Sequence, residues 1–279
     1  MQKFEYSKDN SIVSSGMKIC KMKKNESYRL IQDSIESVFK SNEKIKNFKS
    51  FRSKLLKVQD LINKKEVHIQ IINENKNFFL KLFKVKKLDE LSVQSVVYFR
   101  GVRPYRKNKS EYIGYHRENF YNDFDYINHQ INIHMPVKNY SINSSMKYLP
   151  KSHLINDGEF KFEKINSKKS GIKRFSTSHK IGLPYNPKKI ISGVDIKKAK
   201  RLKLKVGEFV AFSSRLIHGG GENHTDKVRF SIDFGLIKKK IVIKKNKKFH
   251  FSSYHINKKH YVNIKFNHKK NEKRVALNS

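Results

Sequence analysis

The sequence predicts a mainly β fold with flanking helices, in which a jelly-roll core (a double-stranded β-helix) follows a helical N-terminal region. From about residue 93 onward, short β-type runs are separated by turn-prone stretches. Many short strands with irregular links are typical of a sandwich or jelly roll. Before that point, apolar residues recur at helical spacing. The chain has no internal repeat and no regular alternation of strands and helices, which argues against a parallel α/β fold.

The N-terminal third is expected to be helical after a short polar arm. Residues 1–25 are polar and predict a short strand or an irregular segment. Residues 26–84 carry two apolar stripes at helical spacing: Tyr28, Ile31 and Ile35 in the first, and Leu55, Val58 and Ile62 in the second. Spacings of three and four residues place these side chains on one face of a helix, where they form core.

Five runs predict the strands of the core: residues 93–101, 127–137, 146–149, 202–212 and 228–237. The last run shows the pattern most clearly, because apolar and small or polar residues alternate in it: Phe230, Ile232 and Phe234 against Ser231, Asp233 and Gly235. Successive strand residues point to opposite faces. One face of this strand is therefore expected to be packed, and the other to line a polar space.

We expect residues 1–279 to form one domain. Residues 1–92 supply helical support and residues 93–237 the catalytic core, with a basic insertion or lid at about 154–201 and basic C-terminal strands or a tail at 238–279. A long connection of this kind is usually a functional lid or a disordered segment. A solvated, lysine-rich loop is the competing interpretation.

The net charge of +38 is large enough to attract nucleic acid, an anionic membrane or a phosphorylated substrate. The chain is also rich in Lys, Asn and Ile, a composition that an AT-rich genome produces without selection for anion binding. The basic residues are spread widely, and no RNA-recognition or zinc-finger motif lies among them. A nucleic-acid-binding protein therefore stays open as an alternative, although the composition favours the neutral explanation.

A single cysteine, Cys20, excludes disulfides and cysteine-based zinc sites within one chain. This fits a reducing compartment. The sequence shows neither the apolar core of a signal peptide nor an apolar run of transmembrane length. We expect a cytoplasmic protein without a membrane partner, and the sequence does not fix its oligomeric state.

The residues that carry chemistry are His116 and Glu118, followed a hundred residues later by His218. In an extended segment, residues two apart point to the same side, so His116 and Glu118 can reach one metal ion. Two histidines and one carboxylate on one face form the facial triad of non-haem Fe(II) oxygenases. Arg229 begins the next alternating strand, where it can bind a carboxylate with two parallel hydrogen bonds.

The order and spacing of these residues resemble the phytanoyl-CoA dioxygenase superfamily of Fe(II)/2-oxoglutarate oxygenases. The resemblance rests on His116-Arg117-Glu118, Pro150-Lys151-Ser152-His153, His218-Gly219 followed by Asn223, and Arg229 followed by Ser231. It spans about residues 95–237. Two positions depart from the family pattern: Glu118 stands where Asp is usual, and Lys151 where Gly is usual.

The resemblance implies a cupin-like core that binds Fe(II) through His116, Glu118 and His218. It also implies that 2-oxoglutarate places its distal carboxylate on Arg229, helped by Ser231, and that O₂ is the second cosubstrate. Succinate and CO₂ are then released as a small-molecule substrate is hydroxylated or otherwise oxidised. Halogenating relatives lack the carboxylate ligand, so its presence here favours hydroxylation or a related oxidation.

Other polar residues are weaker candidates. Gln130 and Asn132 share a strand face with His134 and are candidates for cosubstrate contact. Tyr98, Arg100 and Arg103 precede the metal motif and are candidates for contact with the substrate or cosubstrate, the basic charge favouring an anionic substrate. A cupin-type metal isomerase and an inactive relative are the alternatives on the same fold. The retained Arg229 disfavours both, because it has a specific role only if a dicarboxylate binds.

Overall fold

The computed structural model of the chain describes residues 10–22, 26–40, 47–104, 114–120, 128–165, 168, 172–173, 175–184, 188–244 and 261–264. Its helices are α1 (Asn10–Ser15), α2 (Glu26–Glu36), α3 (Phe48–Lys64), α4 (Val67–Glu74), α5 (Lys76–Phe83), α7 (Thr177–Lys180) and α8 (Lys239–Lys244). Its strands are β1 (Met17–Lys21), β2 (Leu91–Gln94), β3 (Tyr98–Val102), β4 (Ile131–Lys138), β5 (Lys147–Tyr148), β6 (Lys161–Lys164), β7 (Lys188–Ser192), β8 (Lys200–Arg201), β9 (Glu208–Ser213), β10 (His218–Gly219), β11 (Arg229–Lys238) and β12 (Tyr261–Asn263).

Two antiparallel sheets form the core. The main sheet has the strand order β1-β9-β4-β11-β2-β12, and β3 pairs with the first half of β11. The smaller sheet has the order β10-β5-β8, and β6 pairs with β7 as a separate ladder. Neighbouring strands in the sheets are often distant in sequence, as in a jelly roll. The predicted fold class, mainly β with a jelly-roll core and an N-terminal helical region, is confirmed.

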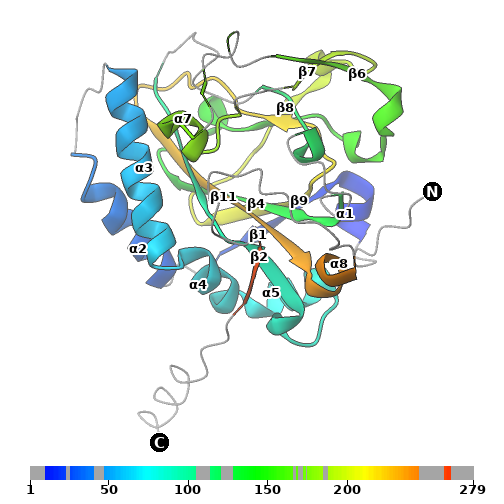
Figure 1. Ribbon diagram of the computed structural model, residues 1–279, viewed down its shortest axis with the longest axis horizontal. Coiled ribbons are helices and arrows are strands. Elements are labelled where there is room, and N and C mark those ends of the chain that lie inside the picture. The colour runs from blue at the N-terminus through cyan, green and yellow to red at the C-terminus, as the bar shows by residue number, and fades with distance from the viewer. Residues whose placement is uncertain are drawn as a thin grey trace, which may run out of the picture.

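Helices α2 and α3 cover one face of the main sheet, to the left of the central strands in Figure 1, whereas α1 lies to their right. Helix α3 begins at an N-cap, Asn47, whose side chain accepts hydrogen bonds from the backbone N–H groups of Lys49 and Ser50. Four of its buried apolar residues follow helical spacing: Phe51, Leu55, Val58 and Ile62. This stripe packs on β3, where Gly101 leaves room for it: a Cβ there would lie 2.6 Å from Leu55. The predicted stripe in this helix is confirmed.

Strands β4 and β11 lie side by side at the centre of the main sheet and divide their side chains between two environments. Apolar residues on one face, such as Ile133 of β4 and Ile232 of β11, join the core shared with the helices. Polar residues alternate with them and point to the other face, toward the interior between the sheets. Those residues are Asn132, His134, Arg229, Ser231 and Asp233, and most of them are buried. The alternation predicted for β11 is confirmed, and its polar face turns toward the predicted site.

The ladder between β4 and β11 shifts register between Phe230 and Ser231, opposite Pro136. Proline has no backbone N–H to donate, so it fits a strand at such an irregularity. Register shifts of this kind re-aim side chains and occur often beside active sites. Here the shift falls next to Ser231.

The insertion at 154–201 contains the β6–β7 ladder and helix α7. The C-terminal end of α7 is held to the core by two buried or half-buried polar side chains. Gln59 of α3 donates to the carbonyl of Lys180 and accepts from the backbone N–H of Phe99. Arg100 donates to the carbonyl of Ile181 at 2.6 Å. This part of the insertion therefore lies on the end of the sheet that carries β3.

Residues 239–244 form helix α8, where the sequence predicted strands or a tail, and β12 pairs with β2 at the edge of the main sheet. Of the aromatic residues in the segment 238–279, Phe249, Phe251, Tyr254 and Phe266 lie outside the described residues, and Tyr261 begins β12. In the part of the chain that the structure describes, no helix has the length and apolar character needed to cross a membrane.

We expect His68 of α4 to make the fold sensitive to acid. Its side chain is 2% exposed, and burial lowers its pKa from 6.5 to about 4. Between these values the unfolded chain binds a proton that the folded chain excludes, so the stability of the fold falls as pH drops below 6.5. The loss reaches about 2 kcal/mol by pH 5. Urea unfolding at pH 7 and pH 5 measures it, and His68→Leu should lose less stability between those pH values by about that amount. An equal loss in both proteins would contradict the prediction.

Candidate metal centre

The two segments that carry the predicted ligands meet through their backbones. His116 and His218 form an antiparallel bridge, with N···O distances of 2.9 and 3.1 Å in the two directions. The backbone N–H of Glu118 donates to the carbonyl of Ser214 at 3.1 Å. His218 is the first residue of β10, and Glu118 opens a 3₁₀ turn. The fold thus brings His218 next to His116 and Glu118, which precede it by about a hundred positions.

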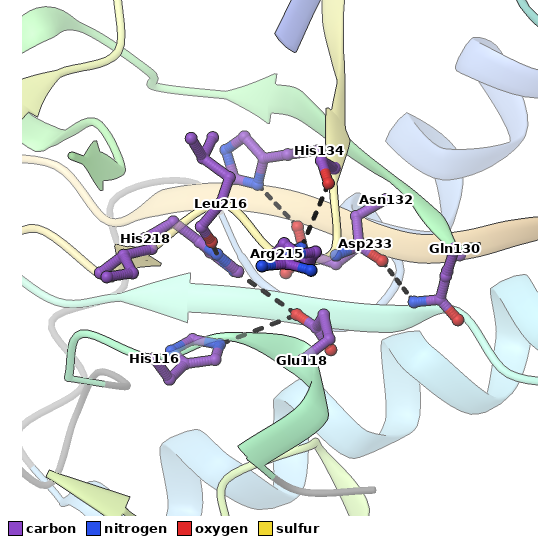
Figure 2. Close-up of polar contacts among 12 residues, drawn as sticks. His116, Glu118, Gln130, Asn132, His134, Arg215, Leu216, His218 and Asp233 are labelled. Atoms are coloured by element: carbon purple, nitrogen blue, oxygen red, sulfur yellow. Dashed lines mark hydrogen bonds and ion pairs between the residues drawn. The ribbon is translucent and has the colours of Figure 1, made fainter. Parts of the chain in front are cut away.

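Their side chains converge at one point, shown in Figure 2. Each offers one donor atom, and the three donors lie within 4.8 Å of one another. Glu118 Oε1 is 3.8 Å from His116 Nε2 and 3.5 Å from His218 Nε2. Both histidines are buried, while the Glu118 side chain is 22% exposed. Two imidazoles and one carboxylate are the ligand set of a facial triad.

The two histidines are oriented by the same local contact. His116 Nδ1 lies 2.7 Å from the carbonyl of Gly114, and His218 Nδ1 lies 2.9 Å from the carbonyl of Leu216. A carbonyl only accepts, so Nδ1 carries the proton and Nε2 presents its lone pair. Metal-binding histidines characteristically donate their second N–H in this way.

The protonation states also suit a metal. Burial lowers the pKa of His116, and the neighbouring His218 lowers it further, so the imidazole is neutral at pH 7. Burial by itself would raise the pKa of Glu118, but hydrogen bonds from His116 and His218, and the positive charge of these imidazoles when they are protonated, hold it well below its usual range. A neutral imidazole and an ionised carboxylate are the forms that bind a divalent cation.

Arg229 lies on the inner face of β11 and is 3% exposed. Its Nη1 donates to Ser231 Oγ at 3.3 Å, and its guanidinium lies over the ring of Tyr140 at 5.6 Å. Its Nε has no hydrogen-bond partner within the described part of the chain. Burial lowers the pKa of Arg229, as expected for a cation that has lost its water and has too few acceptors or anions around it. A carboxylate bound at this point would supply the missing acceptor.

Asp233 is a site residue that the sequence reasoning did not select. It lies two positions after Ser231 on the same face, and its carboxylate contacts two cations or donors: Arg100 Nε at 2.9 Å and His134 Nδ1 at 2.6 Å. His134 Nε2 is 3.1 Å from the hydroxyl of Tyr140. A continuous polar chain therefore links β3, β11 and β4. The alternation of Asp233 with Ile232 was the signal that would have found it.

Gln130 and Asn132 bond to each other through their side chains, as Figure 2 shows. The Nδ2 atom of Asn132 is buried and has no partner among the described residues. Gln130 packs on Gly235, where an added Cβ would lie 2.3 Å from its carboxamide carbon. Gln130 therefore has an evident packing role, and Asn132 retains a donor for a ligand.

The three candidates on and after β3 separate between two faces. Tyr98 and Arg100 point to the inner face, where burial is the main factor that raises the pKa of Tyr98 and the charge of Glu118 raises it further. Arg100 is committed to Asp233 and to the carbonyl of Ile181. Arg103 lies over the rings of Phe48 and Phe51 at 4.9 and 5.6 Å, among the helices. The structure thus places Arg103 away from the cluster of His116, Glu118 and His218.

The glycine run after His218 allows backbones to approach closely. A Cβ at Gly219 would lie 3.0 Å from the carbonyl carbon of Gly114, and one at Gly221 only 2.1 Å from the carbonyl oxygen of Ser145. Asn223 then holds the following loop, since its side chain donates to the carbonyls of Val102 and Lys227. These contacts explain why glycines stand at positions 219 and 221.

Lys151 occupies a left-handed conformation, with φ of 59°. A side chain in this region costs about 1–2 kcal/mol, which glycine avoids at some cost in chain entropy. We expect Lys151→Gly to raise the free energy of unfolding by about 0.5 kcal/mol, which a shift in the denaturant midpoint measures. Lys161→Gly, in the extended strand β6, is a control that should destabilise. A lower midpoint for Lys151→Gly would contradict this account of the turn.

Comparison with known proteins agrees with the site. A sequence model of the family "Phytanoyl-CoA dioxygenase (PhyH)" matches residues 40–231. Among solved structures, EvdO2 from Micromonospora carbonacea var. aurantiaca complexed with 2-oxoglutarate is similar with a TM-score of 0.53 and 15% identity, over 85% of this chain and 90% of EvdO2. The apo form of ThoJ, a non-heme monooxygenase, is similar with a TM-score of 0.50 and 14% identity, over 82% of this chain and 76% of ThoJ. No curated protein matches significantly.

The structural similarities concern the fold, because the identities are low. The family match is broader evidence, since it covers well over half of the chain and includes the segments that carry His116, Glu118, His218 and Arg229. The predicted resemblance is thereby confirmed. The chain belongs to the phytanoyl-CoA dioxygenase family.

Proposed function

We propose that this protein is an Fe(II)- and 2-oxoglutarate-dependent oxygenase that hydroxylates or otherwise oxidises a small molecule. The observation that carries the proposal is a pair of features: the cluster of His116, Glu118 and His218, and, on the inner face of β11, the buried Arg229 whose Nε has no partner in the described chain. A metal site alone would fit many functions. Together with a buried arginine whose Nε is unsatisfied in the described chain, it fits a cosubstrate with a carboxylate.

Each group has a definite task in this proposal. His116 and His218 present Nε2 to the metal, and Glu118 adds a negative charge that balances part of the cation. Arg229 would bind the distal carboxylate of 2-oxoglutarate, with Ser231 and the Nδ2 atom of Asn132 as further donors. When bound, iron and 2-oxoglutarate supply O₂ activation coupled to decarboxylation. The buried surroundings exclude water, which strengthens the bond between Arg229 and the carboxylate.

The retained Glu118 favours hydroxylation over halogenation, because it fills the position that a halide would need. The charge of +38 favours an anionic substrate. If long-range attraction guides such a substrate, KM should rise with added salt, since exposed charges are screened within about 8–10 Å at physiological ionic strength. A KM measured from 20 to 300 mM salt that does not change would count against an anionic substrate, without touching the oxygenase assignment.

Anaerobic titration of the apoprotein with Fe(II) and then 2-oxoglutarate tests the function. The expected result is the visible charge-transfer band of a chelate formed by iron and a 2-oxo acid. Succinate as the second ligand is the control, because it has both carboxylates but no 2-oxo group and gives no such band. A folded protein that shows no band with saturating Fe(II) and 2-oxoglutarate would overturn the proposal.

A further inference from the structure

The turn at residues 149–157, here called the anchor turn, contacts both segments that carry the candidate metal ligands. It includes Ser152, which is fully buried and follows Pro150 and Lys151 in the sequence. None of its residues belongs to the cluster of His116, Glu118 and His218. Its contacts are nevertheless made with the immediate neighbours of all three ligands.

On one side, the anchor turn holds the backbone just before His218. Ser152 Oγ accepts a hydrogen bond from the backbone N–H of Ile217 at 2.8 Å and donates to the carbonyl of Leu149 at 2.7 Å. The carbonyl of Ile217 in turn accepts from the backbone N–H of Leu149 at 2.8 Å. Both backbone groups of Ile217 are therefore fixed by the turn.

On the other side, the anchor turn holds the residue between His116 and Glu118. Arg117 is 0% exposed, and its side chain leaves the segment in the direction opposite to the two ligands, as the period of an extended segment requires. Its Nη2 donates to the carbonyls of Ser152 and Ile155, and its Nη1 pairs with Asp157. Its guanidinium also lies 4.7 Å from the ring of Phe160.

Ser152 is thus the point at which both ligand segments are joined: its hydroxyl binds the neighbour of His218, and its carbonyl binds the neighbour of His116 and Glu118. Arg215 adds a third connection, since its Nη2 donates to the carbonyl of Ile155 at 2.9 Å. The backbone bridge between His116 and His218 holds the two segments together but leaves each segment able to rotate about the line of the bridge. Contacts on the far side of each strand fix their rotation about that line, and rotation decides where the imidazoles and the carboxylate point.

We propose that Ser152 and Arg117 are positioning residues that hold the three ligands at the separation a metal ion needs. The inference rests on the proposed function, because it presumes that the cluster binds a metal. It assigns the Pro150-Lys151-Ser152-His153 element a task at the metal centre without direct contact to the metal. Groups that orient ligands in this way typically change metal affinity by about 10–100-fold when removed.

Ser144 provides a matched control for Ser152. It is also 0% exposed, and its hydroxyl also accepts a backbone N–H and donates to a backbone carbonyl, both from Ser141. Those bonds stay within its own 3₁₀ turn and do not reach either ligand segment. Ser152→Ala and Ser144→Ala therefore remove similar hydrogen bonds from similar environments and differ in what the bonds connect.

The test is an anaerobic titration of the apoproteins with Co(II), followed by its visible d–d bands, with thermal unfolding of each apoprotein measured alongside. We expect Ser152→Ala to bind Co(II) about 10–100-fold more weakly and to shift the bands, while Ser144→Ala binds like the wild type. Equal affinities and bands in all three proteins would overturn the inference, and so would an equal loss in both variants. A wild-type protein that binds no Co(II) would overturn the proposed function as well, which distinguishes the two failures.

If Ser152→Ala does not fold, Asp157→Asn tests whether the anchor turn positions the metal ligands. The Asp157 side chain is 48% exposed, so the substitution leaves the core intact while it removes the charge that holds Arg117. We expect weaker Co(II) binding by a variant that still folds, because the amide oxygen of the introduced asparagine can keep a hydrogen bond to Arg117. Asp195→Asn is its control and should bind Co(II) like the wild type, because the hydrogen bond that the Asp195 carboxylate accepts, from the backbone N–H of Lys197, stays within its own 3₁₀ turn. Unchanged Co(II) affinity in Asp157→Asn would overturn the inference.

Discussion

His218→Ala is expected to abolish the iron-dependent charge-transfer band at concentrations that saturate the wild-type protein. His218 supplies one of only two imidazole nitrogens in the cluster, and its Nε2 is 3.5 Å from Glu118 Oε1. Loss of a group that merely orients a ligand costs about 10–100-fold in affinity, so loss of a ligand itself should cost more than about 100-fold. The measurement is the titration with Fe(II) at fixed 2-oxoglutarate.

His224→Ala is the control for this prediction. His224 lies six residues further on and is exposed. Its backbone N–H donates to the carbonyl of Asn143 at 3.0 Å, and the imidazole can be removed without loss of that bond. The control should keep the band. A band of wild-type strength and affinity in His218→Ala would show that the metal, if bound, is held elsewhere.

Arg229→Met is expected to weaken 2-oxoglutarate binding on the order of 100-fold while Fe(II) binding is retained. Hydrogen bonds to charged groups contribute about 1.5–3 kcal/mol each, and loss of about 3 kcal/mol corresponds to that factor. Arg229 is not among the cluster of metal donors, so the metal affinity has no reason to change. Titration of the Fe(II)-loaded variant with 2-oxoglutarate, followed by the charge-transfer band, gives the dissociation constant.

The stability of the apoprotein separates this role from a structural one. Arg229 is a buried cation whose Nε lacks a partner in the described chain, and its pKa is lowered by burial. Replacing such a group by an apolar side chain of similar length is often neutral or stabilising. We therefore expect apo Arg229→Met to unfold at or above the wild-type temperature. A destabilised variant with unchanged 2-oxoglutarate affinity would mean that Arg229 serves the fold and not the cosubstrate.

The sequence by itself determined the features that depend on local periodicity. The alternation of Phe230, Ile232 and Phe234 with polar residues set the two faces of β11, and the spacing of His116 and Glu118 put both on one side. The same parity separates Arg103 from Arg100, because they lie an odd number of positions apart, and the structure indeed places them in different surroundings. These properties survive folding because the backbone geometry of one strand fixes them.

Only the tertiary structure decided which of these residues meet. The bridge between His116 and His218, the contact of Asp233 with Arg100 and His134, and the join at Ser152 all connect residues that are 35 to 133 positions apart or belong to separate strands. Strand order and register set those contacts, and they depend on how the whole chain packs and not on any one segment. Residues 239–244 also depend on tertiary packing. The sequence predicted strands or a tail for the whole segment 238–279, and these six residues form helix α8 beside β11.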